Sequence, residues 1–211
     1  MMLLFNRHRE PFAKALSLPP EPSVAELGKR FAERGWIAVD GVLSPASIAP
    51  IACAIDTRRF ECRAPQPHAL AAGAASFMFY EQHFRSHRAC RKACAPICAL
   101  SQSLTEERML TFLREISQRR GLSPISVHLR AYVKGSHVDR SVPTRAGVEV
   151  LCCVTPAWDA ALGGQICFAE DTPICPRGGT LYVVERRPEL SAALTLVREH
   201  GPLVMLSAWY E

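Results

Sequence analysis

Apolar and polar residues follow two different patterns along this chain, and the change falls at Gly121. Before Gly121 apolar residues recur at helical spacing, whereas after it short runs rich in Val, Leu, Ile, Cys and Tyr alternate with turn residues. The first pattern indicates amphipathic helices and the second indicates β-strands. The sequence therefore predicts helices before Gly121 and a sheet after it.

The N-terminal part predicts two helices with a strand between them. Ser23 and Glu26 have capping-box spacing at the start of the first helix, and Gly35 ends it. Residues 36–43 alternate like a strand, and the proline that follows Ser44 is typical of the first turn of a second helix.

The segments nearer to Gly121 predict a loop followed by helices. Residues 61–76 hold two prolines and many small residues, which predicts a loop, and a helix is predicted from Phe77. Residues 105–119 carry apolar side chains at helical spacing and predict the most regular helix of the chain.

Strands are predicted after Gly121 at residues 125–133, 147–155, 165–169, 179–185, 192–198 and 203–210. Because helices and strands are segregated rather than alternating, the expected fold class is α+β, mainly β. The expected architecture is an antiparallel barrel or sandwich with the N-terminal helices packed on one sheet.

The composition is that of an ordinary globular protein. The 211 residues are 48% apolar and 21% charged, which predicts one domain over residues 1–211, with residues 1–22 as a loose leader. The net charge of +5 rests mostly on arginine, the acidic residues are spread along the chain, and we interpret most of the charge as solvated surface, so no nucleic-acid partner is expected. We find neither a signal-peptide core nor an apolar run of ~18 residues, so we expect a cytoplasmic protein outside membranes, its cysteines mostly reduced.

The candidate chemistry lies in AYVKGSHVDRSV, residues 131–142. Side chains at positions i and i+2 of a strand leave the same face, so His137 and Asp139 have the spacing to bind one metal ion together. A redox iron of this type needs a third ligand and open positions for substrate and oxygen. The pair alone is therefore an incomplete site.

Five local motifs accompany this pair in a fixed order. Tyr132 and Gly135 form a Tyr-x-x-Gly before it, and VEVLCCVTPAW, GGQICF, PRGGTLYVVE and LSAWYE follow it. From FAERGWIAVDGVLSPASI onward, the chain resembles the iron(II)/2-oxoglutarate-dependent dioxygenases of the prolyl 4-hydroxylase-like branch. The resemblance implies a double-stranded β-helix, a jelly-roll or cupin-like fold, with Fe(II) and 2-oxoglutarate as cofactors. It also implies that His137 and Asp139 are catalytic metal ligands and that Tyr132 donates a hydrogen bond to the cosubstrate.

The chain departs from this family at its other ligands. The family places a second metal histidine on the penultimate core strand and a 2-oxoglutarate-binding basic residue on the last. Anchoring on Trp209 puts these at residues 191–193 and near Leu203, where neither residue type occurs. Three interpretations stay open: His200 is the third metal ligand, a nearby carboxylate takes that place, or the site binds no iron. The carboxylates in question are Glu185 and Glu189.

A 2-oxoglutarate carboxylate in a buried barrel needs a cation, because an unpaired buried charge is costly. Arg130 stands two positions before Tyr132 on the same strand face and is the first candidate. The other candidates are Arg140, Arg145, Arg186 and Arg187.

A second group of metal-ligand residue types has helical spacing. It consists of His83, His87, Cys90, Cys94 and Cys98. One helix cannot surround a tetrahedral ion, so small cysteines facing a core explain this stripe as well as a zinc site does. The adjacent Cys152 and Cys153 are expected to be packing residues.

The sequence thus supports two functional hypotheses. The first is a non-haem iron(II)/2-oxoglutarate-dependent oxygenase that oxidises an amino acid, a peptide or a small metabolite. The alternative is a degenerate member that has lost the standard site and acts as a binding scaffold or as an enzyme with different chemistry. The sequence does not predict the oligomeric state.

Overall fold

Helices precede most of the strands, as the sequence pattern predicts. The computed structural model describes residues 16–55, 60–65, 77–83, 95–139, 146–168, 172–187, 192–199 and 201–211. The helices are α1 (Glu21–Arg34), α2 (Pro45–Ala54), α4 (Ala95–Ser103), α5 (Glu107–Ser117) and the 3-10 turn η4 (Ala160–Leu162). The strands are β1 (Trp36–Val39), β2 (Glu61–Arg63), β3 (Phe77–His83), β4 (Pro124–Tyr132), β5 (His137–Val138), β6 (Gly147–Cys153), β7 (Ile166–Phe168), β8 (Leu181–Arg186), β9 (Ala192–Leu194) and β10 (Leu203–Tyr210).

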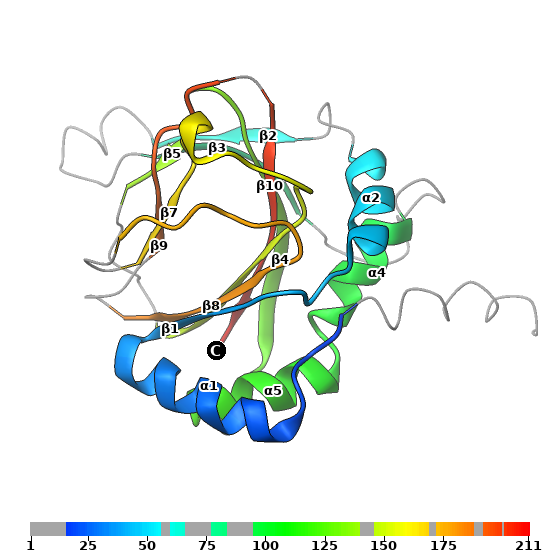
Figure 1. Ribbon diagram of the computed structural model, residues 1–211, viewed down its shortest axis with the longest axis vertical. Coiled ribbons are helices and arrows are strands. Elements are labelled where there is room, and N and C mark those ends of the chain that lie inside the picture. Colours follow the sequence, from blue (N-terminus) through cyan, green and yellow to red (C-terminus); the bar gives the residue numbers. More distant parts are fainter. Residues whose placement is uncertain are drawn as a thin grey trace, which may run out of the picture.

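The strands of the described residues pair antiparallel in the order β1-β8-β6-β10-β4-β3-β5-β9-β7, with β2 added to β3. One end of β3 pairs with β4 and the other end with β5, so β3 passes from a larger sheet to a smaller one. The two sheets face each other as a nearly closed barrel (Figure 1). The expected jelly-roll, double-stranded β-helix fold is confirmed.

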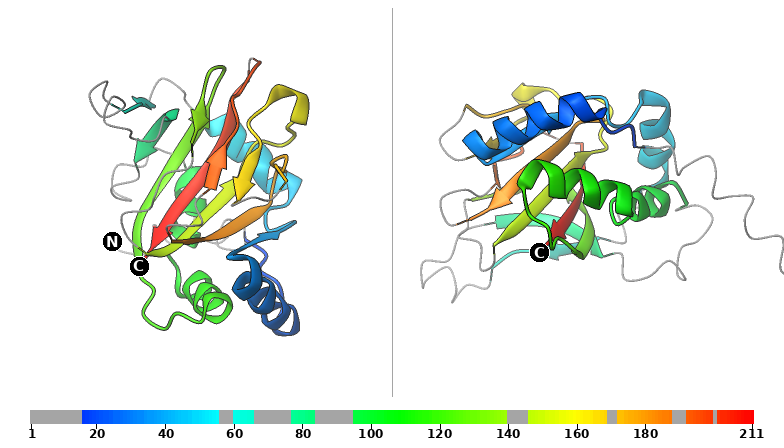
Figure 2. Two further views of the ribbon diagram at one scale, coloured as in Figure 1. Left: turned by 90° about the vertical axis from the view of Figure 1, so that its left-hand side faces the viewer. Right: turned by 90° about the horizontal axis from the view of Figure 1, so that it is seen from below.

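Side chains of the larger sheet alternate between the helices and the barrel interior. In β10, Leu206 and Ala208 pack in the core shared with the helices, whereas Leu203 and Met205 belong to the core inside the barrel. The four α-helices of the described residues lie along the outer face of this sheet, away from β5, β7 and β9 (Figures 1 and 2). The predicted packing of helices on one sheet is therefore confirmed.

The helix ends agree with the sequence in part. Gly35 ends α1 in the left-handed region at φ 74°, and its N–H donates to the carbonyl of Phe31. Ser44 caps α2, because its side chain accepts from the N–H of Ser47 at 3.2 Å. The expected capping box on Ser23 is wrong: α1 begins earlier, after Pro20, and no side chain caps it.

The prediction of a helix from Phe77 is also wrong, because this segment is the strand β3. A short apolar run has no unambiguous period, and here Phe77 and Phe79 lie on one face as in a strand. Helix α4 was not predicted, and neither was β2, which falls within the expected loop. Leu16 is buried and the N–H of Ser17 donates to a backbone carbonyl of the fold, within the range expected as a leader.

No helix in the described part of the chain has the length and apolar character needed to cross a membrane. Two of its cysteines, the free thiols Cys152 and Cys153, are fully buried in β6. Burial raises the pKa of both thiols, that of Cys153 to about 12. Protonated buried thiols are packing groups and not nucleophiles.

These thiols predict a loss of stability in alkaline solution. Folding keeps Cys153 protonated up to a pKa of about 12, whereas the unfolded thiol ionises near 9.0. Unfolding therefore releases a proton above pH 9, and stability falls as the pH rises from there. From pH 8 to pH 10 the Cys153 thiol should cost about 1.4 kcal/mol of unfolding free energy. Urea unfolding at both pH values should show a smaller loss in Cys153→Ala, and an equal loss would contradict the assignment.

Candidate functional site

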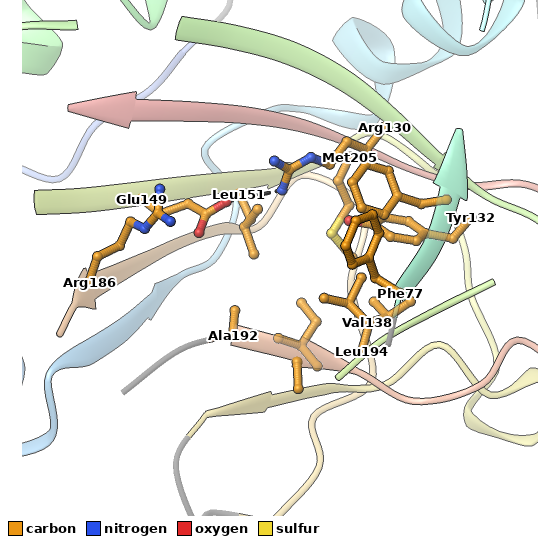
Figure 3. A pocket seen from close by; sticks show the side chains of 13 residues that line it. Phe77, Arg130, Tyr132, Val138, Glu149, Leu151, Arg186, Ala192, Leu194 and Met205 are labelled. Atoms are coloured by element: carbon orange, nitrogen blue, oxygen red, sulfur yellow. Dashed lines mark hydrogen bonds and ion pairs between the residues drawn. The ribbon is translucent and has the colours of Figure 1, made fainter. Parts of the chain in front are cut away.

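The barrel interior contains a cavity of about 340 Å³ between the two sheets (Figure 3). Its volume is at the lower end of the range typical of small-molecule sites. One part of its wall is apolar, formed by Phe77, Phe79, Tyr132, Val138, Leu194 and Met205. The other part carries the three charged residues Arg130, Glu149 and Arg186. The cavity is therefore polarised, with an apolar body and a charged end.

Arg130 lies at the centre of a charged network on the inner face of the larger sheet. Its Nε donates to Glu81 at 3.2 Å and its Nη1 donates to Glu149 at 3.0 Å. The Glu149 carboxylate also accepts from the hydroxyl of Ser207 at 3.1 Å, and Glu81 accepts from Arg63 at 3.3 Å. The strands β2, β3, β4, β6 and β10 each supply one of these residues, which fixes the network across the sheet.

The network holds Arg130 firmly charged. Burial by itself lowers the pKa of Arg130, but the negative charges of Glu149 and Glu81 and the neighbouring Tyr132 phenol outweigh it, and the net shift is upward. Burial raises the pKa of Tyr132, although Arg130 opposes that shift, so the phenol keeps its proton. Tyr132 and Arg130 share one strand face and both line the cavity, as predicted from their spacing. Because two carboxylates of the chain already bind Arg130, it is not a spare cation for a 2-oxoglutarate carboxylate.

Arg186, at the end of β8, differs from Arg130 in its charge balance. Its guanidinium lies over the ring of Trp209, 4.5 Å from the centroid, and it makes no ion pair with any described carboxylate. Glu149, the one acid among the described lining residues, is bound to Arg130 and Ser207. Arg186 is therefore the cation of the cavity wall whose charge the described residues leave unbalanced.

The residue that faces the cavity in the His-x-Asp stretch is the middle one. Val138 lines the cavity, whereas neither His137 nor Asp139 does. The Nδ1 of His137 is 3.3 Å from the carbonyl oxygen of Gly135, and Asp139 is exposed. The structure therefore brings Arg130 and Tyr132 together at the cavity but does not bring His137 and Asp139 to its wall.

The other residues predicted to bind the metal or 2-oxoglutarate lie either outside the described residues or away from the cavity wall. His200, Glu189, Arg140 and Arg145 lie outside the described residues. Glu185 is bound to Arg119 at 3.0 Å and to Arg187 at 3.4 Å, and it does not line the cavity.

The positions aligned with the missing family ligands have apolar side chains. Ala192 and Ala193 line the cavity at the place expected for the second metal histidine, and Leu203 packs in the barrel interior at the place expected for the basic residue. Among the described lining residues Glu149 is the one carboxylate, and none is a histidine. The described residues also contain no cluster of three His, Cys, Asp or Glu side chains suited to a metal. These residues do not fit a two-histidine, one-carboxylate iron site.

Most of the second group of metal-ligand residue types also lies outside the described residues. Of its five members, only His83 and Cys98 are described, and they belong to β3 and α4, so the stripe is not one helix. Cys98 is disulfide-bonded.

Sequence reasoning missed Glu81, Glu149 and the cavity position of Arg186. Glu149 did carry a signal, because it is the one charged residue within the apolar run GVEVLCCV. A charge in such a run requires a buried partner. The partner, Arg130, lies on β4, which is separated from β6 by β10, and sequence spacing does not reveal that pairing.

Comparisons with known proteins support the same fold. No family model matches the chain, and no curated protein matches it in sequence. Among solved structures it is similar to an oxidoreductase of the 2OG-Fe(II) oxygenase family from Burkholderia pseudomallei, with a TM-score of 0.64 and 16% identity over 92% of this chain and 93% of that one. It is also similar to a prolyl hydroxylase in complex with a hypoxia inducible factor peptide fragment, from Trichoplax adhaerens, with a TM-score of 0.63 and 12% identity over 90% and 89% of the two chains.

A third similar structure is HygX from Streptomyces hygroscopicus, with nickel and 2-oxoglutarate bound. Its TM-score is 0.59, with 11% identity over 92% of this chain and 87% of that one. Identities this low establish the fold and not the activity. The chain thus has the fold of the 2OG-Fe(II) oxygenases, prolyl hydroxylases included, as the motifs of its sequence imply.

Proposed function

We propose that this chain uses the oxygenase fold to bind a small organic molecule in the barrel cavity, without iron or 2-oxoglutarate. The proposal rests on the apolar side chains of the cavity wall. Val138 faces the cavity from the His-x-Asp stretch, Ala192 lines it where the resembled family has a metal histidine, and Leu203 packs in the barrel interior where that family has a basic residue. An apolar wall of this kind favours an organic ligand, because burying apolar surface is the main driving force for such binding.

Binding of a neutral apolar fluorophore tests the proposal. N-phenyl-1-naphthylamine should fluoresce strongly with wild-type protein, since the cavity removes its rings from water. Ala192→Leu should weaken the binding at least tenfold, because the added atoms project into the cavity. Ala157→Leu is the matched control, as Ala157 is exposed and does not line the cavity, and it should bind like wild type. Equal binding by all three proteins would refute the cavity as the site.

A second candidate function is the iron(II)/2-oxoglutarate oxygenase, which the fold similarity favours. His137, Asp139 and His200 would then be the iron ligands, and Tyr132 and Arg130 would meet 2-oxoglutarate. The iron would supply oxygen activation for the oxidation of an amino acid, a peptide or a small metabolite. In anaerobic reconstitution this candidate requires stoichiometric iron that is lost in both His137→Ala and His200→Ala. Our proposal expects no retained iron in wild type, and stoichiometric iron with that loss would overturn it.

A further inference from the structure

The charged end of the cavity indicates the charge of the organic molecule that the proposed function places there. This step rests on the proposed function, since it concerns the ligand of the same cavity. Arg130 is balanced by Glu81 and Glu149, which are 3.2 and 3.0 Å from it. Arg186 lines the same cavity and has no ion pair among the described residues. Among the described lining residues two arginines therefore face one carboxylate, and the excess positive charge is that of Arg186.

The surroundings of Arg186 limit the ligand to a single negative charge. Its guanidinium lies over the Trp209 ring, 4.5 Å from the centroid, and cation–π contact leaves the N–H groups of an arginine able to donate to a planar acceptor. A carboxylate matches these donors with two parallel hydrogen bonds. Glu149 lines the same cavity. A second negative charge on the ligand would face this acid without a cation to balance it.

The apolar part of the cavity wall favours a ligand with an aromatic ring system. Phe77, Phe79 and Tyr132 form a row of rings, with centroids 5.7 Å apart in the first pair and 5.8 Å in the second. Their planes are tilted by 36° and 50°, so the row offers both ring faces and ring edges. Leu194 and Met205 complete the apolar wall around these rings. A flat ring system placed here gains offset or edge-to-face contacts in addition to burial.

We infer that the ligand of this cavity is an aromatic monocarboxylate. Its carboxylate pairs with Arg186, and its ring system lies against Phe77, Phe79 and Tyr132. A polar dianion such as 2-oxoglutarate should bind this cavity poorly, because its second carboxylate has no spare cation to pair with among the described lining residues and it has no ring system to pack against the aromatic wall.

Three probes of matched shape or charge test this inference by isothermal titration calorimetry. Naphthalene-2-carboxylate has the inferred features, naphthalene-2-carboxamide has the same ring without the charge, and 2-oxoglutarate is the polar dianion. Wild-type protein should bind the carboxylate roughly 10- to 100-fold more tightly than the carboxamide, the usual range for a charge-assisted pair. It should bind 2-oxoglutarate more weakly than the carboxylate. This comparison needs no variant and cannot be confused with misfolding.

Two neighbouring arginines give the matched pair of variants. Arg186→Gln should lose roughly 10- to 100-fold in affinity for the carboxylate and little for the carboxamide. Arg187→Gln should bind both like wild type, because Arg187 is exposed and does not line the cavity. An equal loss in both variants would overturn the inference, as would tighter binding of 2-oxoglutarate.

Failure of the inference and failure of the proposed function give different results. If the carboxylate and the carboxamide bind equally well, the anion site is wrong while the organic-ligand cavity stands. If neither naphthalene probe binds but N-phenyl-1-naphthylamine does, the aromatic monocarboxylate is again excluded and the cavity is retained. If none of the three binds, both the inference and the proposed function are refuted.

Discussion

Arg130→Met should lower the free energy of unfolding by about 3 kcal/mol, because it removes the cation between two poorly exposed carboxylates. Only 9% of the Glu81 side chain and 16% of the Glu149 side chain are exposed, so water replaces little of the lost interaction. Methionine keeps much of the length and apolar stem of arginine, so the loss reports the charge and its hydrogen bonds. Urea unfolding at neutral pH, followed by circular dichroism, measures the change.

A surface ion pair provides the control for this prediction. Arg177 is 2.9 Å from Asp40, but both side chains are more than half exposed, at 63% and 55%. Arg177→Met should therefore cost less than about 1 kcal/mol. A loss of similar size in both variants would show that Arg130 stabilises the fold no more than an arginine in an exposed ion pair does.

A second substitution, Glu149→Gln, tests the same network through the direction in which it changes the free energy of unfolding. In wild type, Glu149→Gln should destabilise, because it weakens the bonds from Arg130 and Ser207. In the Arg130→Met background the same change should stabilise, because it removes a buried carboxylate that no longer has its cation. Destabilisation in both backgrounds would contradict the charge balance on which the assignment of Arg186 as the spare cation depends.

The fold could be predicted from the sequence because its strands carry strong local signals. The run at 203–210 coincides with β10, and the run at 125–133 differs from β4 by one residue at each end. Both are long, apolar and bounded by turn residues. Segment 77–83 lacked such a signal, since FMFYEQH is short and follows a run of small residues that suits a helix or a loop equally well. Its strand conformation comes from pairing with β4 and β5, which are distant in sequence.

The site was less predictable because its residues meet through sheet pairing. The two-residue spacing of Arg130 and Tyr132 correctly placed both on one face of β4. The same rule gives His137 and Asp139 a common face, but it does not say which face is the interior, and Val138 is the residue that lines the cavity. The contact of Arg130 with Glu149 depends on the order β6-β10-β4, which no local pattern contains.

Side chains close the gap between β1 and β7, where the described strands of the barrel have no backbone pairing. Strands β1 and β7 are the two ends of the strand order and do not pair with each other. Phe168 on β7 stacks on Trp36 of β1, with ring centroids 4.5 Å apart and planes 24° from parallel. It also contacts Tyr182 of β8, with centroids 6.1 Å apart, and is fully buried. These rings hold the smaller sheet against the larger one where backbone hydrogen bonds do not.

Phe168→Ala should therefore lower the free energy of unfolding by roughly 3–5 kcal/mol, the range for a buried phenylalanine, since it leaves a void between the sheet ends. Phe168→Leu should cost distinctly less, because it refills most of that volume and loses mainly the ring stacking. Leu196→Ala is the exposed control, with 51% of the residue accessible, and should change stability by no more than about 0.5 kcal/mol. Urea unfolding of the three variants gives this order directly. A loss below about 1 kcal/mol in Phe168→Ala would mean that backbone pairing through β3 alone holds the two sheets together.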